Sequence, residues 1–111
     1  METNNALEAL AALAHSIRLS VFRILVQAGP EGLPAGRIAE LMTMPASSLS
    51  FHLKELYRAG LLASRQDGRS IIYSARYETM NSLLAYLTEN CCGGNSCSPT
   101  RNCDTTLESS S

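Results

Sequence analysis

Apolar residues recur at helical spacing through most of the chain. Leucines and alanines at this spacing predict a first helix over residues 5–14. A second helix is expected to begin at Ser16, whose hydroxyl can cap it, and to end at the Gly-Pro pair 29–30. After a turn at 31–34, residues 35–42 repeat the apolar spacing. The first part of the chain is therefore predicted to form three short helices.

The most regular amphipathic segment comes next. Pro45 stands where the first turn of a helix tolerates proline, and the helix expected over residues 47–59 carries Leu49, Leu53 and Leu56 on one side. The runs LLASRQ and IIYSAR then flank the turn DGRS, which predicts a β-hairpin. A last helix is expected over residues 78–90.

This order of elements indicates a fold. A short helix, a tight turn, a second amphipathic helix and a hairpin are the parts of a winged helix-turn-helix. We therefore predict a mostly α-helical domain with a small β-hairpin over residues 1–90. Residues 91–111 are rich in Gly, Ser, Asn and Thr and are expected to form a flexible tail that carries all four cysteines.

Composition narrows the class of protein. The chain has 111 residues, of which 45% are hydrophobic and 5% aromatic, a balance that suits a small helical domain stabilised by dimerisation. The apolar runs are too short to span a membrane, and the polar start METNNALEA does not resemble a signal peptide. We expect a cytoplasmic protein with no membrane partner. In that compartment, cysteines serve metal binding or redox chemistry more often than a disulfide framework.

The charge distribution favours a nucleic-acid partner more than the net charge of −1 does. Between residues 14 and 77, eight Arg or Lys residues stand against four acidic residues, a balance of +4. The two ends together hold six acidic residues and one arginine, a balance of −5. A basic centre between acidic ends is typical of a DNA-reading core.

The polar face of the helix at 47–59 provides the candidate DNA contacts. Hydroxyls and cations there suit phosphates and base edges, and an aromatic ring can touch thymine methyl groups. An ordinary solvated face would look similar, but the basic hairpin tip favours DNA. His52 lies at the boundary of the buried side, where a packed, hydrogen-bonded histidine is more common than a ligand. The predicted DNA-binding residues are Ser47, Ser48, Ser50, Phe51, His52, Lys54, Arg58, Arg65, Gln66 and Arg69.

The segments HSIRLSVFRIL and IAELMTMPASSLSFHLKELYRAGLLASRQDGRSIIYSA resemble the ArsR/SmtB family of metal-responsive winged-helix repressors. The resemblance covers roughly residues 7–90. It implies a homodimer, paired through the first and last helices, that binds an inverted-repeat operator in double-stranded DNA and leaves it when an inducer binds. Spacing alone would also allow the leucines of those helices to be ordinary core. The dimer interface implied by the family consists of Leu7, Leu10, Leu13, Met80, Leu83, Leu84 and Leu87.

The chain departs from the family at its two usual sensor positions. Where many relatives carry Cys-x-Cys before the recognition helix, this chain reads ELMTMP and has no thiol. Where zinc sensors carry Asp, His and Glu on the last helix, this chain reads ETMNSLLAYLTE and has no histidine. Either an inducer is bound elsewhere or the protein has none, and the remaining ligand cluster is formed by Cys91, Cys92, Cys97 and Cys103.

The segment AYLTENCCGGNSC resembles a subgroup of arsenic repressors whose As(III) site lies at this end of the last helix. Trivalent arsenic is thiophilic and pyramidal, so three thiolates suit it, as they would Sb(III). Cys91 and Cys92 are adjacent, and Gly93-Gly94 can fold Cys97 back as the third ligand. Cys103 ranks lower because its loop is longer, although the difference in closure entropy is small.

The expected function is therefore an arsenic-responsive transcriptional repressor. A four-cysteine Zn²⁺ site, reversible thiol oxidation and an inert tail remain as alternatives. An enzyme is not expected, because there is no C-x-x-C in a βαβ context and both histidines fall in segments already explained as helical.

Overall fold

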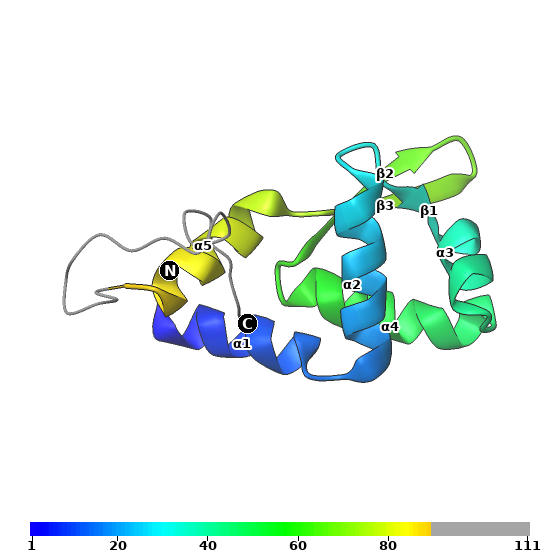
Figure 1. Cartoon of the computed structure of the whole chain (residues 1–111). Helices are drawn as coiled ribbons and strands as arrows, with labels where there is room; N and C mark the ends of the chain where they lie inside the picture. Colours follow the sequence, from blue (N-terminus) through cyan, green and yellow to red (C-terminus); the bar gives the residue numbers. More distant parts are fainter. Residues whose placement is uncertain (90–111) are drawn as a thin grey trace, which may run out of the picture.

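The computed structural model describes residues 1–89, which form five helices and three strands (Figure 1). The predicted winged helix-turn-helix is confirmed: α3 and α4 are the helix-turn-helix pair, and β2 and β3 are the wing. In chain order the elements are α1 (Thr3–Leu13), α2 (Ser16–Ala28), β1 (Leu33–Pro34), α3 (Ala35–Met42), α4 (Ala46–Arg58), β2 (Leu62–Asp67), β3 (Ser70–Ala75) and α5 (Tyr77–Leu87).

Helix α2 begins as predicted, but with a different cap. The residue at the N-cap position is His15, whose backbone is extended and whose Nδ1 accepts a hydrogen bond from the Ile17 amide at 3.2 Å. Ser16 is the first helical residue and does not cap the helix. An imidazole nitrogen can do what a serine hydroxyl does at this position, because both offer a lone pair to an amide that has no partner within the helix.

Residues 31–34, predicted as a turn, contain a third strand. Leu33 pairs with Tyr73 and Pro34 with Ile72, so the antiparallel sheet has the order β1-β3-β2. A proline fits here because β1 is an edge strand, where a missing amide donor does no harm. Gly32 makes this pairing possible: its φ is +73°, and a Cβ atom there would overlap the carbonyl oxygen of Tyr73.

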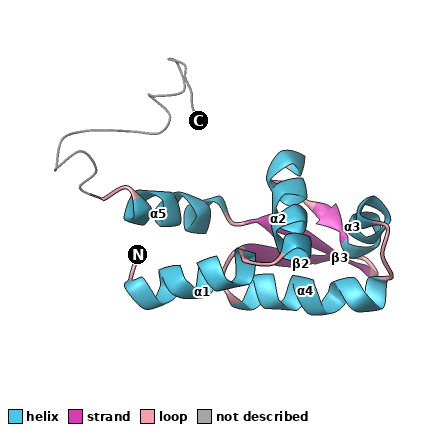
Figure 2. Ribbon diagram, turned by 60° about the horizontal axis from the view of Figure 1, so that its bottom comes forward, coloured by secondary structure: helices cyan, strands magenta, loops and turns pink. Residues whose placement is uncertain are grey.

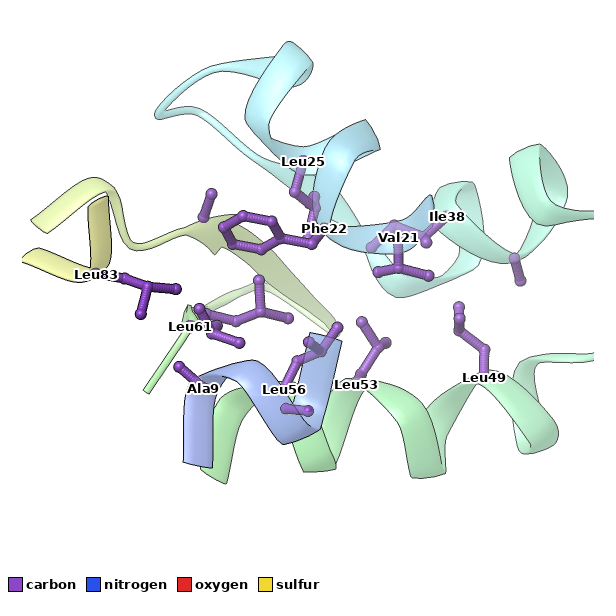
Figure 3. Packing of buried hydrophobic residues seen from close by; sticks show 14 of the residues in the cluster. Ala9, Val21, Phe22, Leu25, Ile38, Leu49, Leu53, Leu56, Leu61 and Leu83 are labelled. Carbon is purple, nitrogen blue, oxygen red and sulfur yellow. The ribbon is translucent and has the colours of Figure 1, made fainter. Parts of the chain in front are cut away.

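The hydrophobic core lies between α4 and the side chains that α1, α2, α3, the sheet and α5 direct toward it (Figure 3). The predicted buried side of α4 is confirmed, since Leu49, Leu53 and Leu56 are fully buried. Helix α1 packs against α2, α4 and α5 and buries only alanines, which lets its backbone come close to its neighbours (Figure 2). The other fully buried large side chains are Val21, Leu25, Ile38, Leu61 and Leu62.

Helices α1 and α2 are both rich in apolar residues. Within residues 1–89, no single helix is long and apolar enough to cross a membrane. The α1–α2 pair has the length and composition together, but it is bent by 101° at the break between the helices. Ala9, Val21 and Leu25, which contribute to this apolar character, are fully buried in the core.

Candidate nucleic-acid interface

Helix α4 presents its predicted polar face to solvent. Ser47, Ser48, Ser50, Phe51 and Lys54 are all exposed, and the Phe51 side chain is 57% exposed. The helix starts after Pro45, which supplies no side-chain cap to its first amides. Uncapped N–H groups at a helix start can donate to a phosphate. The face therefore combines hydroxyls, a cation, an aromatic ring and backbone donors.

Arg58, also predicted to contact DNA, forms an ion pair on the same helix. Its Nη1 donates to Glu55 Oε2 at 3.1 Å, and the arginine side chain is 69% exposed. An exposed pair of this kind contributes about 0–1 kcal/mol. A DNA phosphate can therefore compete with Glu55 for Arg58 at little cost.

His52 sits in a cluster that also involves α2. Its Nδ1 accepts a hydrogen bond from Arg18 Nε at 3.3 Å, and its ring centroid lies 4.8 Å from that of His15. The Phe51 ring meets His52 edge-on at 5.6 Å, and the Arg18 guanidinium lies over Phe51, 5.6 Å from the ring centroid. Burial, with smaller contributions from His15 and Arg18, lowers the pKa of His52 from its ordinary value of 6.5. His52 is thus a packed, hydrogen-bonded residue, as its boundary position indicated.

Arg18 was not among the predicted site residues. It lies 34 residues before His52 in the sequence, in a helix that precedes the helix-turn-helix pair. Nothing local to HSIRLSVF marks this arginine as a neighbour of the recognition helix, because the contact exists only after α2 packs across α4.

The three predicted wing residues differ in how available their side chains are to contact DNA. Arg65 Nη2 donates to the backbone carbonyl of Glu31 at 2.9 Å, so its guanidinium ties β2 to the segment before β1. Gln66 Nε2 donates to the Gly68 carbonyl at 3.3 Å, within the turn. Arg69 is exposed in the two-residue turn and makes no side-chain hydrogen bond or ion pair with the rest of residues 1–89. Arg69 is therefore the wing cation most available to DNA.

A hollow of about 400 Å³ brings the recognition helix and the wing together. It lies between the start of α3, the start of α4 and β3, and its lining includes Ser50, Arg69 and Tyr73. Two predicted DNA-binding residues from distant parts of the sequence thus share one concave surface.

The predicted arsenic ligands Cys91, Cys92 and Cys97, together with Cys103, lie outside the described residues. Within residues 1–89 there is no group of three or more His, Cys, Asp or Glu side chains that could hold a metal ion. Met42 and Met44, in the segment ELMTMP before α4, are partly buried and pack against the core.

The predicted dimer residues fall into three groups by exposure. Leu7, Leu10, Leu84 and Leu87 are exposed large apolar side chains on α1 and α5, which lie in contact with each other. Leu83 is only 6% exposed and belongs to the core of the described chain, so its place at the dimer interface stays a prediction. Leu13 and Met80 are partly buried against that core.

Comparison with known proteins shows which family the chain belongs to. A helix-turn-helix domain profile matches residues 13–65. The HTH-type transcriptional regulator YgaV of Escherichia coli (strain K12) is 32% identical over 83 residues, which cover 75% of this chain and 82% of YgaV. The structure of an ArsR-like transcriptional regulator from Rhodococcus sp. RHA1 matches with a TM-score of 0.67 and 25% identity, covering 78% of each chain. The chain belongs to the ArsR family of helix-turn-helix transcriptional regulators.

The ArsR family is a class of DNA-binding regulators, not of enzymes, and the exposed face of α4 with the wing is the surface suited to DNA. The solution structure of Mb0332 from Mycobacterium bovis, described as a homodimeric winged helix-turn-helix domain, has the same fold. It matches with a TM-score of 0.64 and 21% identity, over 78% of this chain and 81% of that one.

Proposed function

We propose that this ArsR-family regulator is an arsenic-responsive repressor. A homodimer binds an inverted-repeat operator, and As(III) or Sb(III) releases it by binding the thiolates of Cys91, Cys92 and Cys97. One observation carries the proposal: all four cysteines of the chain fall within residues 91–103, directly after the last helix. The described domain itself contains neither a thiol nor a candidate metal cluster.

The chemistry of the cluster supports a soft, thiophilic inducer. Thiolates select soft ions, and As(III) needs three of them and gains little from oxygen or nitrogen ligands. Each thiol gives up its proton as its As–S bond forms, and each proton leaves with one of the three hydroxides of As(OH)3 as water, so the exchange balances without net release of protons.

The position of the cluster supports coupling to DNA binding. The cysteines follow α5, and α5 shares with α1 the exposed leucines Leu7, Leu10, Leu84 and Leu87. A second copy of the chain would bury these side chains and set the spacing of the two recognition helices. That spacing must be about 34–36 Å for successive major grooves. A ligand bound at the end of α5 would then change the distance between the two recognition helices.

The required coupling is modest. Arsenite can shift the dimer only by its differential affinity for the DNA-competent and released states. A coupling free energy of about 1–3 kcal/mol weakens operator binding roughly 5- to 150-fold.

The test is fluorescence anisotropy of the protein on DNA from its own promoter, titrated with arsenite, Zn²⁺ or peroxide. Arsenite should release the wild-type protein and the matched control Cys103→Ser, while Cys91→Ser, Cys92→Ser and Cys97→Ser should stay on the DNA. Unchanged release by those three variants would remove the cysteines from the site. Release by Zn²⁺ or peroxide, with no response to arsenite, would instead support the zinc-sensing or thiol-redox alternative.

A further inference from the structure

Arg18 makes two contacts at once with consecutive residues of the recognition helix. Its Nε donates to His52 Nδ1, and its guanidinium covers one face of the Phe51 ring. The His52 ring closes the arrangement by meeting Phe51 edge-on, and the imidazole of His15 lies against His52 from the start of α2. A residue outside the helix-turn-helix pair thus contacts two of the predicted DNA-binding side chains.

The hydrogen bond fixes the proton of His52. An imidazole nitrogen that accepts from a guanidinium must have a free lone pair, so Nδ1 is unprotonated. A neutral ring then carries its single proton on Nε2. No hydrogen bond joins Nε2 to any other residue among 1–89. His52 is therefore prepared as a hydrogen-bond donor through one defined nitrogen.

The same arginine restrains Phe51. This ring is 57% exposed, and an exposed aromatic side chain would otherwise lose rotational freedom only when DNA binds. With a guanidinium on its face and an imidazole at its edge, the ring is held before the DNA arrives. Such restraint favours DNA binding, because the side-chain entropy of the ring is already reduced in the free protein and less is lost when the complex forms.

The charged groups around His52 leave the hydrogen bond from Arg18 to His52 in place. From α2 it is faced by His15 and Arg18, whose cationic forms both oppose protonation of His52. The carboxylates near Arg18 are Glu8 and Glu55, which line a hollow of about 340 Å³ together with it. Glu55 is paired with Arg58. Within residues 1–89 neither carboxylate forms an ion pair with Arg18, whose Nε donates to His52 Nδ1 instead.

We propose that Arg18 is a specificity-determining positioning residue for DNA reading: it orients Phe51 toward a thymine methyl group and His52 Nε2–H toward a purine acceptor on a neighbouring base pair. Phe on a thymine methyl and a donor on guanine N7 or O6 or adenine N7 are pairings that the major groove provides. The proposal rests on the DNA-binding assignment of the family and is independent of arsenic sensing.

The test compares variants of the full chain on promoter DNA in which each base pair of the bound site is substituted in turn. Arg18→Lys keeps the charge but cannot both cover Phe51 and donate from a fixed Nε. Arg23→Lys is the matched control, since Arg23 is exposed on the same helix, five residues and about 140° further round. Arg18→Lys should flatten the preference at adjacent base pairs on the order of tenfold, the effect of losing one good base contact. Arg23→Lys should leave the base profile unchanged.

Two readouts separate positioning from simple phosphate binding. The salt slope and the affinity for unrelated DNA should stay the same in Arg18→Lys. Histidine ¹⁵N spectra of the free protein should show His52 protonated on Nε2, with the tautomer becoming mixed in Arg18→Lys. His52→Gln should keep more of the base preference than His52→Asn, because the glutamine amide nitrogen reaches the place of Nε2 and the asparagine amide that of Nδ1.

The outcomes that would overturn the proposal are specific. Equal loss of affinity for operator and unrelated DNA in Arg18→Ala, with a salt slope smaller by about 0.9, would make Arg18 a phosphate contact. An unchanged base profile in Arg18→Lys, with a thermal midpoint like that of the wild type, would show that Arg18 plays no part in reading sequence.

Discussion

Gly32 allows β1 to pair with β3, and replacing it with alanine tests how the wing is attached. Two consequences follow from the backbone. The residue has φ of +73°, where an L-amino acid costs about 1–2 kcal/mol. In addition, its new Cβ would overlap the Tyr73 carbonyl oxygen, which belongs to the sheet backbone and cannot rotate away.

Gly68→Ala is the matched control. Gly68 has φ of +63°, close to that of Gly32, but a Cβ there meets nothing within 4 Å. The control therefore carries the same backbone strain without the overlap. After allowing about 0.4–1 kcal/mol for the lower entropy of the unfolded alanine chain, we expect Gly68→Ala to lower the free energy of unfolding by about 1 kcal/mol.

Gly32→Ala should cost more because the overlap forces β1 away from β3. That movement breaks the pairing at Leu33 and Pro34 and strains the Arg65 hydrogen bond to Glu31. With about 1 kcal/mol for each of two or three hydrogen bonds, the total reaches about 3–4 kcal/mol. This is a large fraction of the roughly 5–15 kcal/mol that stabilises a small domain.

The measurement is urea unfolding followed by circular dichroism, at equal protein concentrations so that any association affects all proteins alike. The midpoint should fall about three times further for Gly32→Ala than for Gly68→Ala. Equal shifts in the two variants would refute the argument that close approach to Tyr73, rather than backbone conformation alone, requires glycine at position 32.

Three further predictions address the DNA surface, the histidine and the apolar face. Lys54→Ala should reduce the slope of log affinity against log salt by about 0.9, measured by anisotropy, if this exposed lysine neutralises one phosphate; an unchanged slope would place it off the DNA. Because burial and its cationic neighbours lower the pKa of His52 below 6.5, the unfolded chain takes up the proton first as the pH falls. The contribution of neutral His52 to the free energy of unfolding is fully present above pH 6.5 and is lost as the pH falls through the pKa that His52 has in the folded protein. His52→Gln should therefore show a smaller loss of stability over that pH range in urea titrations. Leu87→Asp should give a monomer in sedimentation while Leu41→Asp, at a leucine on α3 that is 46% exposed against 55% for Leu87, should not; a monomeric wild type would remove the α1–α5 face as the dimer contact.

Periodicity predicted the features of the fold that depend on local sequence. The order of helices, the buried side of α4 and the hairpin around Asp-Gly all follow from spacing and turn chemistry within a few residues. Strand β1 could not be predicted this way. Two residues show no alternation, and Leu33 and Pro34 are extended because they pair with β3, some 40 residues later in the chain.

For the candidate site too, the sequence predicted what depends on local spacing and missed the contacts between distant residues. The exposure of Ser47, Phe51 and Lys54 follows from the helical period. The partners of the other side chains do not: Arg18 reaches His52, and Arg65 reaches Glu31, across 34 residues in each case. Adjacent leucines posed the same problem on α5, where spacing placed both Leu83 and Leu84 on one side and only packing separates the buried residue from the exposed one.

The light anchoring of α5 has a consequence for how the domain opens. Of the described helices it alone buries a single residue, Leu83, and two tyrosines add hydrogen bonds: Tyr77 to the Val26 carbonyl at 3.0 Å and Tyr86 to the Thr3 hydroxyl at 2.6 Å. The second bond closes 83 residues of chain, the longest loop closed by a side-chain hydrogen bond within residues 1–89, so its closure entropy is the largest among those bonds. We therefore expect α5 to open as a separate cooperative unit, whose amides exchange with solvent while α2, α3 and α4 stay folded. Helix α5, which precedes the cysteines in the sequence, would then separate from the core and repack many times while the DNA-reading helices stay folded.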